Sequence, residues 1–154
     1  MTGQPMLKLS RKTVLALEAV LDVAYNARPN PVQARDITER QGIPQRYLEQ
    51  VMQQLVRAGV LKGVRGPRGG YTLARERRRV TVGDVVRVVS ALEAEGEDSP
   101  TGGALADKVV GPMWDVMQAD LLTRLDAMTM EDLCREAVRK KVRRADEAPP
   151  DFEI

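Results

Sequence analysis

Apolar residues recur at helical spacing through the first third of the chain. A first helix is predicted from Ser10, a good N-cap, to about residue 27, with Val14, Leu17, Leu21 and Ala24 as its apolar stripe. After the breaker "RPNP", a short helix is predicted over about 33–41. The tight connection "QGIP" follows it, and a third helix is predicted over about 45–58. Its positions Leu48, Val51, Met52 and Leu55 match the i, i+3, i+4, i+7 template.

The next segment changes from helical to strand-like spacing. The stretches "VLKGV" and "GYTLA" are two short strand candidates, and "RGPRG" lies between them. The predicted order is therefore a helix, a helix–turn–helix and a β-hairpin. This order is that of a winged helix–turn–helix, and the fold class is mainly α with a small β-hairpin wing.

The second half of the chain returns to helical spacing. A fourth helix is predicted to begin after the cap residue Thr81. This helix completes a predicted DNA-binding domain over residues 7–92. The acidic, glycine-rich stretch 93–104 is predicted to be a flexible loop. Two helices over 105–140 follow, the first with a kink or restart at Pro112 and the second beginning after Thr129. Residues 141–154 are predicted to be a disordered tail.

The charge of the chain is unevenly distributed along its 154 residues. Residues 1–80 carry 15 Lys or Arg and 6 Asp or Glu, a net charge of +9, whereas residues 81–154 carry 9 and 16, a net charge of −7. A basic first half indicates a polyanionic partner such as double-stranded DNA, and the alternative is a chance division of solvated charges. The sequence shows neither a membrane span nor a secretory signal, so we expect a soluble, cytoplasmic protein.

The chain has one cysteine, Cys134, and no histidine. This excludes a disulfide within the chain, histidine-based zinc sites and Ser-His or Cys-His catalysis, but not carboxylate, lysine or metal-carboxylate chemistry. No nucleophile–base pair or metal constellation is visible in the sequence, so we expect no enzyme. Cys134 lies at an apolar position of the last helix and is predicted to be a small buried hydrophobe, with a thiol sensor as the alternative. The acids Glu93, Glu95, Glu97 and Asp98 offer oxygen ligands for a hard cation, although a solvated loop is the simpler interpretation.

The outer face of the third helix has the chemistry of a recognition helix. Arginine and glutamine read purine edges in the major groove, and glutamate accepts a hydrogen bond from cytosine N4. The candidates for such contacts are Arg46, Glu49, Gln50 and Gln53. The alternative is an ordinary solvated helix face.

The tip of the predicted hairpin carries two arginines among glycines. Arg65 and Arg68 are candidates for a narrow minor groove, and Lys62, Arg75 and Arg77 to Arg79 are candidates for phosphate contacts. A plain hairpin turn is one alternative. A nucleotide phosphate loop is rejected, because the Lys-Ser/Thr pair is missing and strand-forming residues follow.

The long helix predicted over 105–127 has an apolar stripe that suits a helix partner. A helix of this kind beyond a winged domain either packs against its copy in a dimer or returns to its own domain. The dimer would place two recognition helices on two half-sites. The candidate dimerisation residues are Val109, Met113, Trp114, Val116, Met117 and Leu121.

The combination of "RYLEQ", "VRGPRGGY" and "TVGDV" in this order resembles the Rrf2-type transcriptional regulators, a family that includes IscR, NsrR and CymR. The resemblance covers roughly residues 7–134. It implies a homodimer on a palindromic promoter element, with Arg46, Tyr47, Glu49 and Gln50 in the major groove. It also implies that Arg65 enters the minor groove and that the helix at 105–127 forms the dimer. We expect a repressor.

The sequence departs from the family's cluster-binding members in one respect. Those members place three cysteines in and after the loop that here reads "EGEDSPTGGALADKVVG", which contains none. We therefore predict no cofactor, because a conventional iron–sulfur cluster needs thiolate or imidazole ligands. The signal would then be a small molecule, a protein partner, a thiol event at Cys134 or an unusual cluster with carboxylate ligands. A protein-interaction adaptor that keeps the fold is the alternative function.

Overall fold

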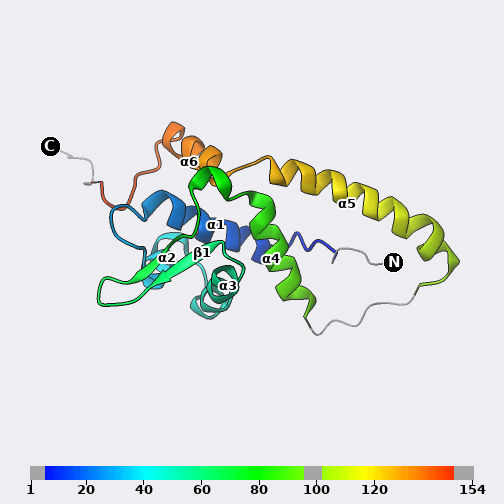
Figure 1. The fold of residues 1–154 in the computed structure, drawn as a ribbon, viewed down its shortest axis with the longest axis horizontal. Helices are drawn as coiled ribbons and strands as arrows, with labels where there is room; N and C mark the ends of the chain where they lie inside the picture. Colours follow the sequence, from blue (N-terminus) through cyan, green and yellow to red (C-terminus); the bar gives the residue numbers. More distant parts are fainter. Residues whose placement is uncertain (1–5, 96–101, 148–154) are drawn as a thin grey trace.

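The computed structural model describes residues 6–95 and 102–147 of the chain. Figure 1 shows a body of helices around a small sheet, with one long helix extending away from it. In chain order the elements are α1 (Arg11–Asn26), α2 (Ala34–Gln41), α3 (Gln45–Arg57), β1 (Leu61–Val64), β2 (Gly70–Leu73), the one-turn helix η1 (Arg77–Arg79), α4 (Val82–Ala94), the π-helical turn η2 (Ala106–Val110), α5 (Gly111–Asp126) and α6 (Met130–Arg139). The predicted fold class, mainly α with a β-hairpin wing, is confirmed.

The helix–turn–helix forms as its sequence predicts. Gly42 ends α2 in the left-handed conformation (φ 66°), and its amide donates to the carbonyl oxygen of Thr38 at 2.9 Å. Pro44 then precedes α3. The four apolar positions predicted for α3 are all buried: Leu48, Val51, Met52 and Leu55. Their burial fixes which face of α3 points outward.

The buried face of α1 differs from the predicted stripe. Val14 is half exposed, whereas the polar residues Thr13 and Asp22 are buried. Asp22 accepts hydrogen bonds from Arg40 Nε at 2.9 Å, Arg40 Nη2 at 2.8 Å and Gln41 Nε2 at 2.8 Å. The predicted apolar stripe is wrong at these positions. The spacing of apolar residues does not reveal a carboxylate that is buried with hydrogen-bonding partners on α2.

The wing is an antiparallel hairpin in which Leu61 pairs with Leu73 and Val64 with Gly70. Pro67 lies second in the tip turn, which is closed by the amide of Gly69 donating to the carbonyl oxygen of Gly66 at 2.9 Å. Val32 adds an isolated bridge at the outer edge of β2. Its amide donates to the Tyr71 carbonyl oxygen at 3.0 Å and its carbonyl accepts from the Tyr71 amide at 2.8 Å. The wing is thereby attached to the segment that precedes α2.

Helices α4 and α6 begin side by side. Thr81 caps α4 by accepting from the Asp84 amide, and Thr129 caps α6 by accepting from the Asp132 amide. Thr81 and Thr129 also form an isolated antiparallel bridge. The Val82 amide donates to Met128 O and the Met130 amide donates to Val80 O, both at 2.8 Å. These bonds join the end of the long helix to the start of α4.

The two segments predicted to lack structure are partly regular. Helix α4 continues through Ala94, so the predicted loop at 93–104 begins inside a helix, and residues 96–101 lie outside the described residues. Residues 141–147, which we expected to be disordered, lie against α1. Tyr25 Oη donates to the Val142 carbonyl oxygen, and the Ala145 amide donates to Asn26 Oδ1 at 2.8 Å. The rest of the predicted tail, 148–154, lies outside the described residues.

Pro112 lies in the first turn of α5, which begins at Gly111 directly after the π-helical turn η2, so the helix changes its geometry where a kink or restart was predicted. The π-helical turn η2 precedes it, and the Gly111 amide donates to the Ala106 carbonyl oxygen five residues back. Proline has no backbone N–H to donate, and this wider turn accommodates the missing hydrogen bond. A Cβ atom at Gly111 would lie 2.7 Å from that carbonyl oxygen, which explains the glycine. Among the described residues, no helix is long and apolar enough to cross a membrane.

Candidate nucleic-acid interface

The outer face of α3 carries the predicted base-reading side chains in an exposed row. Arg46, Glu49, Gln50 and Gln53 are all solvent exposed. Glu49 accepts a hydrogen bond from Gln45 Nε2 at 3.1 Å, which holds its carboxylate along the helix. Arg46 has no ion-pair partner in the part of the chain that the structure describes. The face therefore offers a cationic donor beside hydrogen-bonding amides and one acceptor.

Tyr47 stands apart from these residues, because its side chain is half buried between α3 and α1. Its Oη donates to the Lys12 carbonyl oxygen at 2.6 Å. Burial, together with the nearby negative charge of Glu93, raises the pKa of Tyr47 to about 12. The hydroxyl is thus a neutral donor that connects the start of α3 to the start of α1. In this arrangement Tyr47 orients α3, and the groove contact that the resemblance implies for it stays a prediction.

The N-terminus of α1 is a basic surface that the sequence reasoning missed. Arg11 and Lys12 are exposed, and Lys12 Nζ lies 6.0 Å from the centre of the Tyr47 ring. Cations in a first helical turn oppose the helix dipole, so they are unfavourable for helix stability alone. Two adjacent cations at the start of a predicted helix were therefore a signal in the sequence that these residues have a role other than stabilising the helix.

The wing presents three exposed cations, Lys62, Arg65 and Arg68. Within the described residues none of them has an ion-pair partner. A Cβ atom at Gly69 would lie 2.2 Å from the Val64 carbonyl oxygen, and Gly66 has φ 115°. The glycines are therefore required by the compact turn that brings Arg65 and Arg68 to the tip of the wing.

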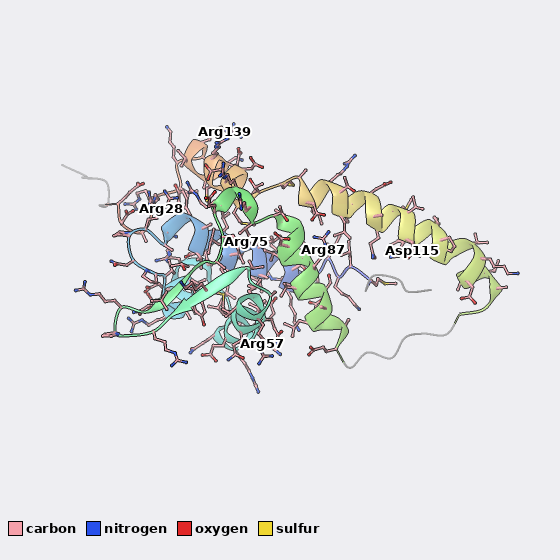
Figure 2. The ribbon with its side chains drawn as sticks, viewed as in Figure 1. Arg28, Arg57, Arg75, Arg87, Asp115 and Arg139 are labelled. Carbon is pink, nitrogen blue, oxygen red and sulfur yellow. The ribbon has the colours of Figure 1, made fainter. Side chains whose placement is uncertain are left out.

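Most of the basic link after the wing is engaged within the protein, but Arg79 is exposed and has no ion-pair partner among the described residues. Arg75 lies 3.4 Å from Asp84, Arg77 lies 3.0 Å from Glu131, and Arg78 lies 2.6 Å from Glu76. Three of the arginines considered for phosphate contacts are thus already neutralised. Figure 2 shows Arg57, at the end of α3, on the opposite side of the body from Arg28 and Arg139. The free cations of α3 and the wing therefore define the candidate interface.

The long helix formed by η2 and α5 exposes most of its apolar side chains. The exposed fraction is 58% for Val109, 47% for Met113 and Trp114, 63% for Val116 and 58% for Met117, and Leu121 is half buried. A hollow of about 180 Å³ lies between α5 and the N-terminal segment, lined by Leu7, Leu9, Trp114, Met117, Gln118 and Leu121. An apolar surface of this extent is typical of an association site.

Cys134 is buried in the core, as predicted, with 2% of its surface exposed. Burial raises the pKa of its thiol, and the nearby Arg77 guanidinium opposes that shift only in part. Among the described residues no three His, Cys, Asp or Glu side chains are grouped as metal ligands. The side chain of Glu93 accepts from Ser10 Oγ at 2.7 Å, and Glu97 and Asp98 lie outside the described residues. One buried thiol and no imidazole do not fit a conventional iron–sulfur cluster.

Comparison with known proteins places this geometry among transcriptional regulators. The profile described as "Rrf2: Iron-dependent Transcriptional regulator" matches residues 9–136. The HTH-type transcriptional regulator IscR of Vibrio campbellii is 34% identical over 134 residues, covering 84% of this chain and 79% of that protein. The IscR of Cronobacter sakazakii is 30% identical over 154 residues, covering 91% and 95%.

Two solved structures share the fold along most of the chain. T. potens IscR has a TM-score of 0.69 at 34% identity and covers 90% of this chain and 94% of that one. CymR, the global cysteine regulator of B. subtilis, has a TM-score of 0.65 at 30% identity and covers 85% and 98%. These relatives are regulators and not enzymes, as the sequence predicted.

Proposed function

The chain belongs to the Rrf2 family of transcriptional regulators, and from this premise we propose that it is a repressor that binds a palindromic promoter element as a homodimer. The observation that carries the proposal is the set of cations on α3 and the wing that have no acidic partner in the described residues. Arg46, Lys62, Arg65 and Arg68 all belong to it. Unpaired cations on a helix–turn–helix and its wing are suited to the phosphates and base edges of DNA.

The proposed contacts divide into two kinds. On α3, Arg46, Gln50 and Gln53 have the donors that read purines in the major groove, and Glu49 has the acceptor for cytosine. At the wing, Arg65 is proposed to enter the minor groove, while Lys62 and Arg68 contact phosphates. Tyr47 holds α3 against α1, and the exposed Lys12 beside it adds a further phosphate contact.

The proposed homodimer uses the exposed apolar face of α5. Val109, Met113, Trp114, Val116 and Met117 leave a large apolar area in water in the single chain, and a second copy would cover it. Two-fold symmetry would then present two α3 helices to two half-sites of opposite orientation. Such a dimer would bind a palindromic element.

We propose that the signal is not a conventional iron–sulfur cluster. The only thiol, Cys134, is buried in the core and the chain has no histidine, so the usual ligands are missing. The test is anaerobic purification followed by visible absorption and iron analysis. A colourless, iron-free protein that binds DNA is the expected result. A coloured protein with stoichiometric iron would contradict it.

The test of DNA binding compares the promoter region of the protein's own gene with a scrambled duplex at several salt concentrations. We expect Arg65→Ala to weaken specific binding by about 1–3 kcal/mol. Glu49→Ala should relax base choice without abolishing binding, because the loss of an acceptor leaves the phosphate contacts in place. Arg139→Ala, an exposed arginine on α6, is the control and should bind as the wild type does.

Equal affinity for the promoter and the scrambled duplex would reject the proposal. Co-purification with a protein partner, together with no protected DNA across the genome, would favour the adaptor function instead. An unchanged footprint for both Arg65→Ala and Glu49→Ala would reject the residue roles and leave the family assignment intact.

A further inference from the structure

A basic cavity lies on the α6 side of the body, where the segment after α1, the helix η1 and α6 meet. Its volume is about 390 Å³, and its lining consists of charged side chains only: Arg28, Glu76, Arg77, Arg78, Glu131 and Arg135. Figure 1 shows α6 and α3 at opposite sides of the body. A duplex bound along α3 would therefore not fill this cavity.

The charges that line the cavity do not balance. Four guanidinium groups face two carboxylates. Glu131 is shared by Arg77 at 3.0 Å and Arg135 at 3.5 Å, and Arg78 pairs with Glu76 at 2.6 Å. Arg28 has no ion-pair partner in the described residues. The cavity thus holds two positive charges more than its own acids neutralise.

One hydrogen-bond donor of a lining residue, Arg77 Nε, is buried without a hydrogen-bond partner among the described residues. Arg77 Nε lies 3.0 Å from a Glu131 oxygen, but its N–H is not directed at that oxygen, and it has no hydrogen-bond acceptor among the described residues. A buried N–H without an acceptor costs free energy, and native structures fill such positions with an acceptor. Because this atom is out of contact with solvent, an oxygen in the cavity would reach it only once the Arg77 side chain moves away from Glu131.

We propose that this cavity binds a small metabolite through its oxyanion group, a phosphate or a carboxylate, and that this metabolite is an effector of the regulator. Guanidinium groups bind both groups with paired, charge-assisted hydrogen bonds. Arg28 and Arg135 are the exposed arginines of this lining that are available to a ligand, whereas the Arg77 side chain is only 24% exposed. The volume accommodates a molecule larger than a single inorganic ion.

The site is placed to influence the wing. Helix η1, which carries Arg77 and Arg78, follows β2 directly and precedes α4. A ligand oxyanion would compete with Glu131 for Arg77 and with Glu76 for Arg78. The contact between η1 and α6 would loosen, and the chain between the wing and α4 would shift. This coupling rests on the proposed DNA-binding function, whereas oxyanion binding does not.

The experiment is calorimetric titration of the full chain with inorganic phosphate, and separately with citrate, against chloride at equal ionic strength. We expect saturable binding of one of the two probes. Binding of phosphate would indicate a phosphate group on the effector, and binding of citrate would indicate a carboxylate group. Arg135→Gln should weaken binding about tenfold or more, because it removes a charge-assisted partner. Arg28→Gln should do the same.

Arg139→Gln is the matched control. It lies one turn further along α6, its side chain is 71% exposed against 74% for Arg135, and it also pairs with a glutamate. Binding equal to wild type in this variant supports the site. Equal loss in Arg135→Gln and Arg139→Gln would overturn it, as would no heat beyond that of chloride. Direct competition, in which the probe and a scrambled DNA duplex are never bound together, would also overturn it, because the cavity would then be part of a DNA-binding surface.

The coupling is measured on promoter DNA with the better probe at constant ionic strength. A change of threefold or more in affinity that is lost in Arg135→Gln is expected. If the oxyanion binds but the affinity for promoter DNA does not change, the effector role is refuted and the oxyanion site itself is retained. Loss of specific DNA binding in every condition, with oxyanion binding intact, would reject the proposed function alone.

Discussion

The carboxylate of Asp126 at the end of α5 accepts two hydrogen bonds from the Arg87 guanidinium of α4, from Nη1 at 2.7 Å and from Nη2 at 2.6 Å. A bidentate pair of this kind fixes the relative orientation of its two helices. It joins the long helix to the DNA-binding body. The arginine holds the pKa of Asp126 below its usual value of 3.8.

The Asp126 pair should contribute a pH-dependent part of the stability. Because the pKa of Asp126 is lowered in the folded state, its contribution is complete well above pH 3.8 and is lost as the pH falls through the lowered pKa. We expect Asp126→Asn to reduce the free energy of unfolding by about 0.5–1 kcal/mol at pH 7, since the pair is partly exposed. Urea titrations across pH 2.5–7 measure this, and a difference between the proteins that persists unchanged at the lowest pH would contradict it.

Gly83 leaves the space that Asp126 occupies. A Cβ atom at this position would lie 1.9 Å from Asp126 Oδ1 and 3.2 Å from Arg87 Nη1. Gly83→Ala should therefore destabilise the wild type by displacing the carboxylate. In an Asp126→Ala background the same substitution should stabilise by up to about 1 kcal/mol, because alanine is the better helix former. A double-mutant cycle of thermal unfolding measures the reversal of sign, and equal effects in both backgrounds would refute it.

The attachment of the wing to Val32 depends on Gly70. This residue has φ 155°, and a Cβ atom would lie 2.4 Å from the Val32 carbonyl oxygen, which is rigid backbone. Gly70→Ala should cost about 2 kcal/mol or more and expose the Val32 and Tyr71 amides to hydrogen exchange. Gly63→Ala is the control in the paired strand, because nothing lies within 4 Å of its added Cβ. A loss of stability as large in the control would reject this explanation.

The apolar face of α5 should determine the oligomeric state. Val116→Glu is expected to convert dimers to monomers at micromolar concentration, because a charge would be buried in the proposed interface. Val138→Glu, on α6, is an equally exposed control at 63%. Sedimentation over a hundredfold range of concentration distinguishes the two. Dimers in both variants would show that the interface lies elsewhere on the molecule.

The local features of the fold were predictable from the sequence, and the family assignment is confirmed by the match over residues 9–136. Apolar spacing identified the buried face of α3, and the caps Thr81 and Thr129 marked the starts of α4 and α6. The glycines of the wing tip identified the hairpin. Each of these features is encoded by neighbours within a few residues of one another.

The features that escaped prediction depend on residues far apart in the chain. Asp22 is buried because Arg40 and Gln41 reach it from another helix, and Tyr47 turns inward because it bonds to a carbonyl of α1. The bridge at Val32 is a single residue long, which is too short for a periodic pattern. For the candidate site, the residue types on α3 and the wing were visible in the sequence. The pairing of Arg77 with Glu131 joins residues far apart in the chain, so the sequence did not reveal it.

The bridge between Thr81 and Thr129 has a consequence for how the chain can vary. The direction of α5 is fixed where it ends, by this bridge and by the Asp126 pair, rather than where it begins. Insertions or deletions between α4 and α5 would therefore leave the long helix in place.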